Sequence, residues 1–317
     1  MMTKIVNQYH SGASKNIKMG FTGPHFGIEL ELVANAVDFC LEEMDAPVVE
    51  KSGGYFEDVF LSGFANYLEG VFNQHGFPEN CYLFEKDGSL ISHESYEDCG
   101  TENGIEVIFQ PMNLNVILAL DWVGLFDTLR SKKWMLLGNR RAGLHIHLGR
   151  YALSNTSYNN LRALWIDALY MPEDFRLKMF GRKSNAYCSG LDCKLEYSPY
   201  DLGDDNYDED DVYAFDHFDY PRDAVVSVPN GYSYFDEIVR TSRYVPLNLT
   251  REDTIESRMF ASPTMGGQIL RAVDYVKKLY ADDVLESLHL PENYSQKEFY
   301  ATLQKYTLLG RHGWCDN

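Results

Sequence analysis

No stretch of this sequence approaches the roughly 18 consecutive apolar residues that a membrane-spanning helix requires. The start of the chain, MMTKIVNQYHSGASKNIKMG, also lacks the apolar core of a secretory signal, so we expect a cytoplasmic protein with no membrane partner. There is no disulfide framework either. The six cysteines are scattered, as suits reduced thiols, at Cys40, Cys81, Cys99, Cys188, Cys193 and Cys315.

Basic side chains are scarce, because 28 Lys and Arg face 47 Asp and Glu and the net charge is −19. A field of that sign disfavours nucleic-acid binding, which needs a basic surface to neutralise phosphates. It does not exclude a nucleotide, since metal ions and local arginines can offset the repulsion. Much of the acidity lies in positions 201–211, where seven of eleven residues are acidic, which is typical of a solvated loop.

The known glycine-rich phosphate loops are absent. The chain contains neither a GxxxxGK[ST] loop nor a GxGxxG that opens a helix, and it has no internal repeat. If ATP binds, metals and side chains must hold it rather than a helix N-terminus.

Hydrophobic periodicity predicts an α+β fold on a largely antiparallel sheet, with helices packed on one face. We expect a polar arm over residues 1–24 and a single catalytic domain over 25–317, with an irregular acidic, Tyr-rich insertion or lid at about 190–235. Strands are predicted at 27–34, 82–92, 104–111, 142–149, 242–249 and 254–262, with a turn at Asp87-Gly88 and a stop at Pro111. Helices are predicted at 55–75, from Asn113 to about Lys133, after Ser154, at 264–281 and at 295–309.

Four of these strands share one pattern. Because residues i and i+2 of a strand project from one face, each has an apolar face and an opposite face that bears functional groups. The polar faces carry, strand by strand, Glu29 and Glu31, then Glu106, then His145 and His147, and finally Glu256 and Arg258. Any one of them could be a solvated sheet face. Together, on one sheet, they would form a concave set of metal ligands and anion-binding groups.

Such a set suits phosphoryl transfer. Magnesium takes carboxylate oxygens and leaves sites for water and nucleotide phosphates, while imidazole and guanidinium groups neutralise charge on the transferred group. A zinc hydrolase would more often use two or three histidines with one carboxylate. Here carboxylates outnumber imidazoles, which favours magnesium or manganese.

At these residues the sequence resembles the amidoligase family, carboxylate–amine ligases that share the glutamine synthetase fold. The matching segments occur in family order, from about residue 26 to residue 280, and leave the 190–235 stretch without a counterpart. They are FGIELEL, EKDGSL with GIEVIFQPM, RAGLHIHLG, FGRKSNAYC, and SRYVPLNL leading into TIESRMF. The resemblance implies a curved, glutamine-synthetase-like sheet. One departure is Ser257, which lies on the apolar side, where the family usually has an aromatic or small residue.

The resemblance also implies roles for individual residues. Glu29, Glu31 and Glu106 would be metal ligands shared between two ions, and His145 and Glu256 would bind the ion nearest the nucleotide. His147 and Arg258 would contact ATP phosphate and the transferred phosphoryl group. Substrate contacts would come from a family motif and two further positions, with Arg182 also counted as catalytic: Arg182, Asn185, Tyr187, Asn248 and Asp87.

The implied reaction joins a small-molecule or peptide carboxylate to an amine through an acyl-phosphate, at the expense of ATP. Three alternatives stay open: a phosphoryl transferase of the guanidino-kinase type, a non-catalytic binding protein that retains the fold, and a metal hydrolase built on His145 and His147. We further expect the metal ligands to converge on one sheet face and the 190–235 stretch to border the site as a lid.

Overall fold

The computed structural model describes residues 5–6, 24–44, 53–90, 102–149, 173–182, 246–248 and 254–279. Several predicted segments therefore lie outside the described residues. These are the 190–235 insertion, the helical region directly after Ser154, the helix at 295–309 and most of the strand at 242–249. In the described part of the chain, no helix combines the length and the apolar composition needed to cross a membrane.

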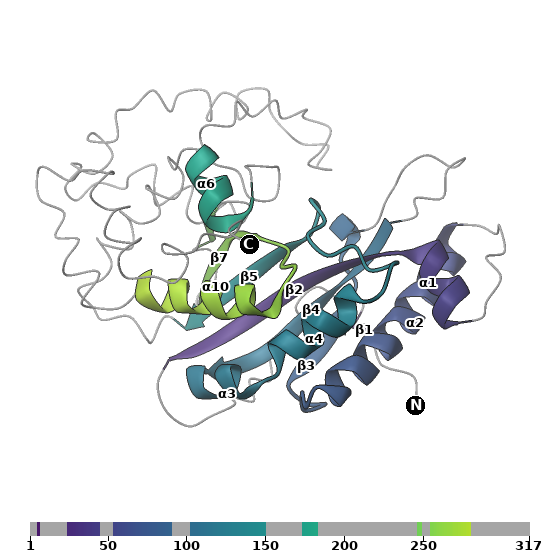
Figure 1. Ribbon diagram of the computed structural model, residues 1–317, viewed down its shortest axis with the longest axis horizontal. Helices are drawn as coiled ribbons and strands as arrows, with labels where there is room; N and C mark the ends of the chain where they lie inside the picture. The colour runs from purple at the N-terminus through teal and green to yellow at the C-terminus, as the bar shows by residue number, and fades with distance from the viewer. Residues whose placement is uncertain are drawn as a thin grey trace, which may run out of the picture.

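The described strands form one seven-stranded sheet in the order β1-β3-β4-β2-β5-β7-β6 (Figure 1). Neighbouring strands run antiparallel except β1 and β3, which are parallel. The strands are β1 (Ile5–Val6), β2 (His25–Asn35), β3 (Tyr82–Glu85), β4 (Glu102–Asn113), β5 (Gly143–Gly149), β6 (Leu247–Asn248) and β7 (Thr254–Ala261). The predicted α+β fold on a largely antiparallel sheet is confirmed, and β1 lies within the predicted N-terminal arm.

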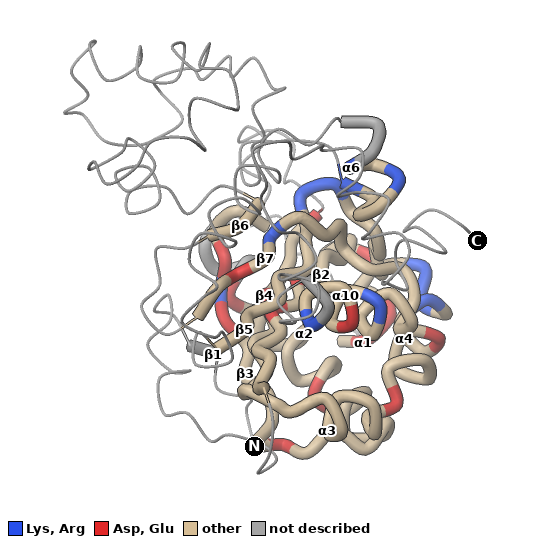
Figure 2. Tube along the Cα trace, turned by 90° about the vertical axis from the view of Figure 1, so that its left-hand side faces the viewer, with Lys and Arg blue, Asp and Glu red and all other residues tan. Residues whose placement is uncertain are grey.

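Helices cover one face of this sheet (Figure 2). Most of them pack there against the apolar side chains of the strands, while α6 lies beside β7. The helices are α1 (Ala36–Glu43), α2 (Gly53–Gln74), α3 (Leu114–Ala119), α4 (Trp122–Arg130), α6 (Glu173–Phe180) and α10 (Gly266–Leu279). The core that results is continuous from β3 to β7. A small separate apolar cluster includes Val33 of β2, with Leu90 and Ala142.

The long helix predicted from Asn113 is two helices. Asn113 does cap α3, since its side chain accepts a hydrogen bond from the Val116 amide. The helix ends at Ala119, however, because the backbone of Leu120 is extended. Asp121 then caps α4 by accepting from the Gly124 amide. The break changes the phase of the helix. Leu118 and Val123, which the apolar pattern of one continuous helix would place toward the core, are exposed instead.

Two strand boundaries also differ from the prediction. β4 does not stop at Pro111 but continues to Asn113, because the register with β2 shifts between Phe26 and Ile28 and the proline falls at this irregularity. The Asp87-Gly88 step does not close a hairpin. It leads into a short 3-10 turn, η1 (Gly88–Leu90), and the antiparallel partner of β3 is β4.

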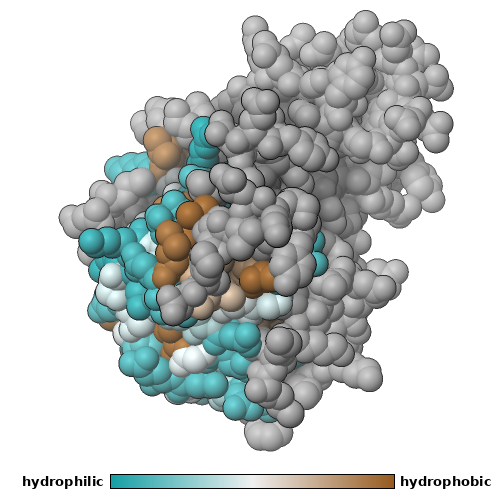
Figure 3. All heavy atoms as spheres, turned by 90° about the vertical axis from the view of Figure 1, so that its right-hand side faces the viewer, coloured by the Kyte–Doolittle hydropathy of each residue, from teal (hydrophilic) through white to brown (hydrophobic). Residues whose placement is uncertain are grey.

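An aromatic cluster joins α1 and α2 to the loop before β5. Phe39 packs edge-on against Phe60, Phe64 and Trp134, with ring centroids 5.6, 5.4 and 4.8 Å away. On the outer side of these helices the described atoms are mainly hydrophilic, with a few hydrophobic groups among them (Figure 3). Leu41, on the same helix as Phe39, is 54% exposed.

Replacing Phe39 with alanine should cost about 3–5 kcal/mol of unfolding free energy, because it removes a fully buried ring and leaves a cavity among three others. Leu41 lies two residues after Phe39 in α1 and is exposed. The unfolding free energy of Leu41→Ala should therefore stay within about 0.5 kcal/mol of the wild-type value. Urea unfolding with unchanged m-values checks both. Equal losses for the two variants would contradict the proposed packing.

Candidate active and metal-binding site

Strand register brings the predicted polar residues into adjoining positions on the face away from the helices. The pairs are Glu29 with His145, Glu31 with Glu106, His147 with Glu256, Glu85 with Glu106, and Asn248 with Glu256. Six neighbouring strands thus contribute one or two polar residues each to a continuous row. All of these side chains are buried.

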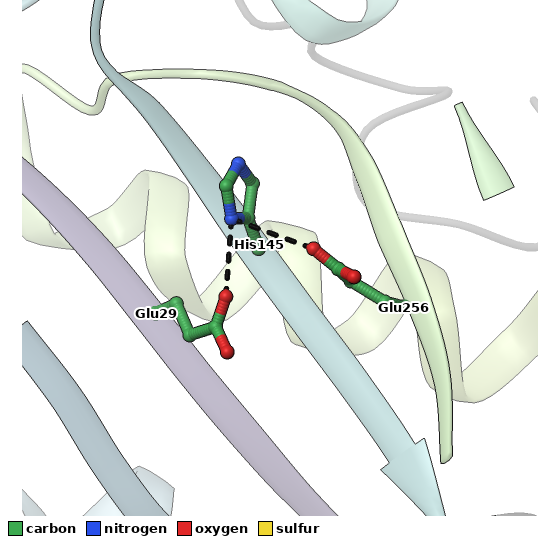
Figure 4. Close-up of side chains that lie close together, drawn as sticks. All are labelled: Glu29, His145 and Glu256. Atoms are coloured by element: carbon green, nitrogen blue, oxygen red, sulfur yellow. Dashed lines mark hydrogen bonds and ion pairs between the residues drawn. The ribbon is translucent and has the colours of Figure 1, made fainter. Parts of the chain in front are cut away.

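One group of possible metal ligands lies between β2, β5 and β7 (Figure 4). His145 Nδ1 is 3.2 Å from Glu29 Oε2 and 3.6 Å from Glu256 Oε1. The three ligand atoms lie within 4.8 Å of one another. A single cation between them could contact all three.

A second group lies between β2, β4 and β5 and includes the same imidazole. His145 Nε2 is 3.7 Å from Glu31 Oε1, and Glu106 completes the group. The other oxygen of Glu31, Oε2, accepts a hydrogen bond from the Gly143 amide. Glu31 is therefore oriented by the backbone of β5, the strand that carries His145.

His147 lies beside the first group. Its Nε2 is 3.0 Å from Glu29 Oε1, and its Nδ1 is 3.4 Å from Thr254 Oγ1. A side chain at Gly27 would press on this imidazole, since a Cβ built there lies 3.2 Å from the Cβ of His147. The glycine of the GIELEL segment thus makes room for His147.

Glu256 carries two donors on its two oxygens. Arg258 Nη1 donates to Oε1, and Asn248 Nδ2 donates to Oε2 at 2.6 Å. All three side chains are buried, with Glu256 fully so. The arrangement holds a guanidinium group beside the first metal-ligand group, where it could also meet an incoming anion.

A β-bulge presents Arg258. Leu144 pairs with Phe260 and Ile146 with Ser257, so Arg258 and Met259 together lie opposite His145. Arg182, which follows α6, braces this bulge because its Nη1 donates to the carbonyl oxygens of residues 258 and 260, at 3.2 and 3.4 Å.

Arg182 passes over Gly143, and a Cβ built on that glycine would collide with its guanidinium group. The predicted substrate residue Arg182 is therefore part of the site, but its described contacts are with the backbone of β7. Its Nε is buried and has no hydrogen-bond partner among the described residues.

The carboxylates of the first group stay ionised. Burial alone would raise the pKa of Glu29, but the charge of His147 and hydrogen bonds from both histidines outweigh it and hold the pKa well below its usual range. Burial likewise opposes ionisation of Glu256, and Arg258 with His147 lowers its pKa despite the repulsion from Glu29. This group carries its own counter-charges.

In the second group, burial and repulsion act in the same direction on Glu106. Burial raises the pKa of Glu106 well above its usual range, and the charges of Glu29, Glu31, Asp87 and Glu85 raise it further. Glu106 Oε2 is buried without a hydrogen-bond partner among the described residues, and so is His145 Nε2. Such atoms are rare in native proteins and call for a water or an ion.

Divalent cations fit both groups. The donors are carboxylate oxygens with one imidazole, a set that suits magnesium or manganese. A cation held by Glu31 and Glu106 would supply the positive charge that this buried pair lacks. A cation held by Glu29, Glu256 and His145 would lie next to Arg258 and His147. The unpartnered atoms of Glu106 and His145 are the observation on which this fit rests.

The structure thus brings together most of the predicted site residues. Asp87 is buried in the turn after β3, where its side chain accepts from the Ser89 amide and its charge acts on Glu106. Two predicted substrate residues, Asn185 and Tyr187, lie outside the described residues.

Sequence reasoning missed two residues of the site, Glu85 and Thr254. The alternation of β3 could have identified Glu85, because Tyr82 and Phe84 face the core and Glu85 faces the other side. No pattern in the sequence distinguishes Thr254, whose role depends on where β7 meets His147.

Glu106→Gln should raise the melting temperature of the protein in the presence of a chelator at neutral pH. Because the folded state raises the pKa of Glu106, ionising this group costs stability, and the cost grows as pH rises above the unfolded pKa of about 4.3. The gain should disappear below that pH, where the glutamate is protonated in both states. The exposed Glu42→Gln serves as the control, and thermal unfolding across pH 4–8 that shows no gain at Glu106 would contradict the charge balance.

Comparison with known proteins gives one match. The model of the family described as "Putative amidoligase enzyme" matches residues 23–280, which include every described site residue. No curated protein and no solved structure matches the chain. The match covers most of the chain and spans the complete sheet apart from β1, which indicates ligase activity in general terms. The chain belongs to this amidoligase family.

Proposed function

We propose that this amidoligase joins a carboxylate to an amine with ATP, using two magnesium or manganese ions. The observation that carries the proposal is the shared sheet face on which two groups of buried carboxylates adjoin His147 and Arg258. Cation sites next to a guanidinium group suit a substrate that carries several negative charges, as ATP does.

In the first step, an oxygen of the substrate carboxylate attacks the γ-phosphorus of ATP. The bond from that phosphorus to the β–γ bridging oxygen breaks, and ADP leaves with an acyl-phosphate as the other product. Divalent cations held by the two groups would neutralise phosphate charge during this step. Arg258 and His147, which lie beside the first group, would take up the charge that develops on the transferred phosphoryl group.

In the second step, the amine nitrogen attacks the acyl carbon, phosphate leaves, and an amide or isopeptide bond forms. The amine must lose a proton, for which a carboxylate near the acceptor is suited. Arg182, with its buried Nε, is a candidate to contact the acyl-phosphate or the donor carboxylate. The donor and acceptor would be small molecules or peptide side chains.

The direct test is ADP release by the purified protein against a panel of amino acids and polyamines, with and without magnesium. Ligation releases one ADP for each amine that is consumed. A stable phosphorylated product without amine consumption would instead identify a phosphoryl transferase of the guanidino-kinase type. ATP-independent hydrolysis with zinc would identify a metal hydrolase, and the absence of any turnover would favour a binding protein.

Arg258→Lys should lower turnover by about 10²–10³ while leaving metal affinity nearly unchanged. Arginine presents a planar fork that can bind two phosphoryl oxygens, whereas lysine offers one point charge. Arg258 is a cation and not a metal ligand, so manganese binding followed by calorimetry should be close to that of the wild type.

The control for this change is Arg130→Lys, on the half-exposed surface of α4, where the same exchange should leave turnover within a few-fold. If Arg258→Lys also retained turnover within a few-fold of the wild type, Arg258 would not contact the transferred group.

Gly143→Ala should lower turnover by about 10²-fold, because the added methyl group displaces Arg182 from the bulge that presents Arg258. Gly70→Ala is the matched control, since a Cβ at Gly70 in α2 meets no atom within 4 Å. Steady-state kinetics of both variants and of Arg182→Met test whether Gly143→Ala acts through Arg182. In the Arg182→Met background, Gly143→Ala should add little further loss, and fully additive losses would contradict it.

A further inference from the structure

One imidazole is placed between the two groups of carboxylates. His145 Nδ1 faces Glu29 and Glu256, at 3.2 and 3.6 Å, and Nε2 faces Glu31, at 3.7 Å. Both groups of possible metal ligands include this residue. The Nδ1 side of the ring faces carboxylates of the first group and the Nε2 side faces Glu31 of the second. The residue is 2% exposed.

A neutral imidazole has one proton and one lone pair on its ring nitrogens. If one nitrogen ligates a cation, the other carries the proton and must donate it, and this donor sets the orientation of the ligand. His145 therefore cannot ligate cations on both sides at once. Whatever occupies one group determines what His145 presents to the other.

We propose that His145 couples the two cation sites, as a ligand through Nδ1 in the Glu29–Glu256 group and as a hydrogen-bond donor through Nε2–H to the Glu31–Glu106 group. This inference rests on the cation sites of the proposed function. It assigns to His145 a second task, the positioning of the carboxylates that hold the other ion.

The distances and the charges both favour this assignment. Nδ1 has two carboxylate oxygens close by, whereas Nε2 has one at a longer distance. The carboxylate oxygens of the Glu29–Glu256 group already contact Asn248, Arg258 and His147. An imidazole nitrogen would therefore add a cation ligand that these contacts do not occupy.

The Glu31–Glu106 group has carboxylates in excess, because Glu85 and Asp87 also act on Glu106. Among the described residues, the hydrogen-bond donor to this group is the Gly143 amide, which donates to Glu31 Oε2. Glu106 Oε2 and His145 Nε2 are both buried, and neither has a hydrogen-bond partner among the described residues. A small shift of the carboxylates on cation binding would let Nε2–H donate to one of them.

Replacing His145 with asparagine or with glutamine distinguishes the role of Nδ1 from that of Nε2. The amide of asparagine can stand in for Nδ1 and that of glutamine for Nε2, since each carries both a donor and an acceptor. We would place His145→Asn and His145→Gln in two backgrounds. Glu106→Gln leaves the Glu29–Glu256 group intact, and Glu256→Gln leaves the Glu31–Glu106 group intact. Manganese affinity is then measured by the paramagnetic resonance signal of free Mn²⁺, with far-ultraviolet circular dichroism as the control for folding.

The expected result is a crossing pattern. In the Glu106→Gln background, His145→Gln should weaken Mn²⁺ binding by about tenfold or more, and His145→Asn by much less. In the Glu256→Gln background the order should reverse. Equal losses for both amides in both backgrounds would overturn the coupling, while failure of the wild-type protein to bind Mn²⁺ at all would overturn the proposed function as well.

A measurement on the unaltered protein is independent of how the variants fold. Long-range ¹H–¹⁵N spectra report which nitrogen of His145 carries the proton. With saturating Mg²⁺ we expect the proton on Nε2 and the shift of a ligated nitrogen at Nδ1. A proton that stays on Nδ1 after Mg²⁺ saturation would contradict the assignment.

Discussion

Repulsion among buried carboxylates is the constraint around which this molecule is organised. Glu29, Glu31, Glu106 and Glu256 occupy one face of one sheet and are nearly inaccessible to solvent, where like charges interact more strongly than in water. The protein balances half of this charge itself, with His147 and Arg258 beside Glu29 and Glu256. Around Glu106, burial and the charges of four other carboxyl groups raise the pKa of this group instead. Cations bound beside Glu106 would offset this repulsion, as the proposed function requires.

The sheet can hold these charges because its two faces have separate tasks. Along β2, Ile28, Leu30 and Leu32 pack into the core beneath the helices while the glutamates between them face the site. Each glutamate of β2 is thus fixed by the two apolar neighbours on its own strand. Side chains on paired strands keep their spacing better than side chains on loops.

Period-two alternation is why so much of the site could be predicted from the sequence. It assigns Glu29, His145 and Glu256 to polar faces without knowledge of the strand order, since the rule is local to each strand. Features that depend on tertiary contacts could not be predicted in this way. The break at Leu120 arises where Asp121 caps a new helix, and the contact of Arg182 with β7 joins residues 76 positions apart. Glu85 was predictable in principle, because β3 alternates as the other strands do.

The bulge in β7 shows why alternation alone does not describe the polar face of the sheet. A regular strand that keeps Ser257 opposite Ile146 would bring residue 259, not Phe260, opposite Leu144. The extra residue restores the core position of Phe260, and it leaves Arg258 and Met259 together opposite His145. The carbonyl groups of residues 258 and 260 accept hydrogen bonds from Arg182, and the amide of Arg258 donates to the carbonyl of Pro246. One irregularity therefore links Arg258, the imidazole between the two groups of carboxylates, and Arg182, which follows α6. A change at any of the three should be transmitted to the others through the backbone of β7.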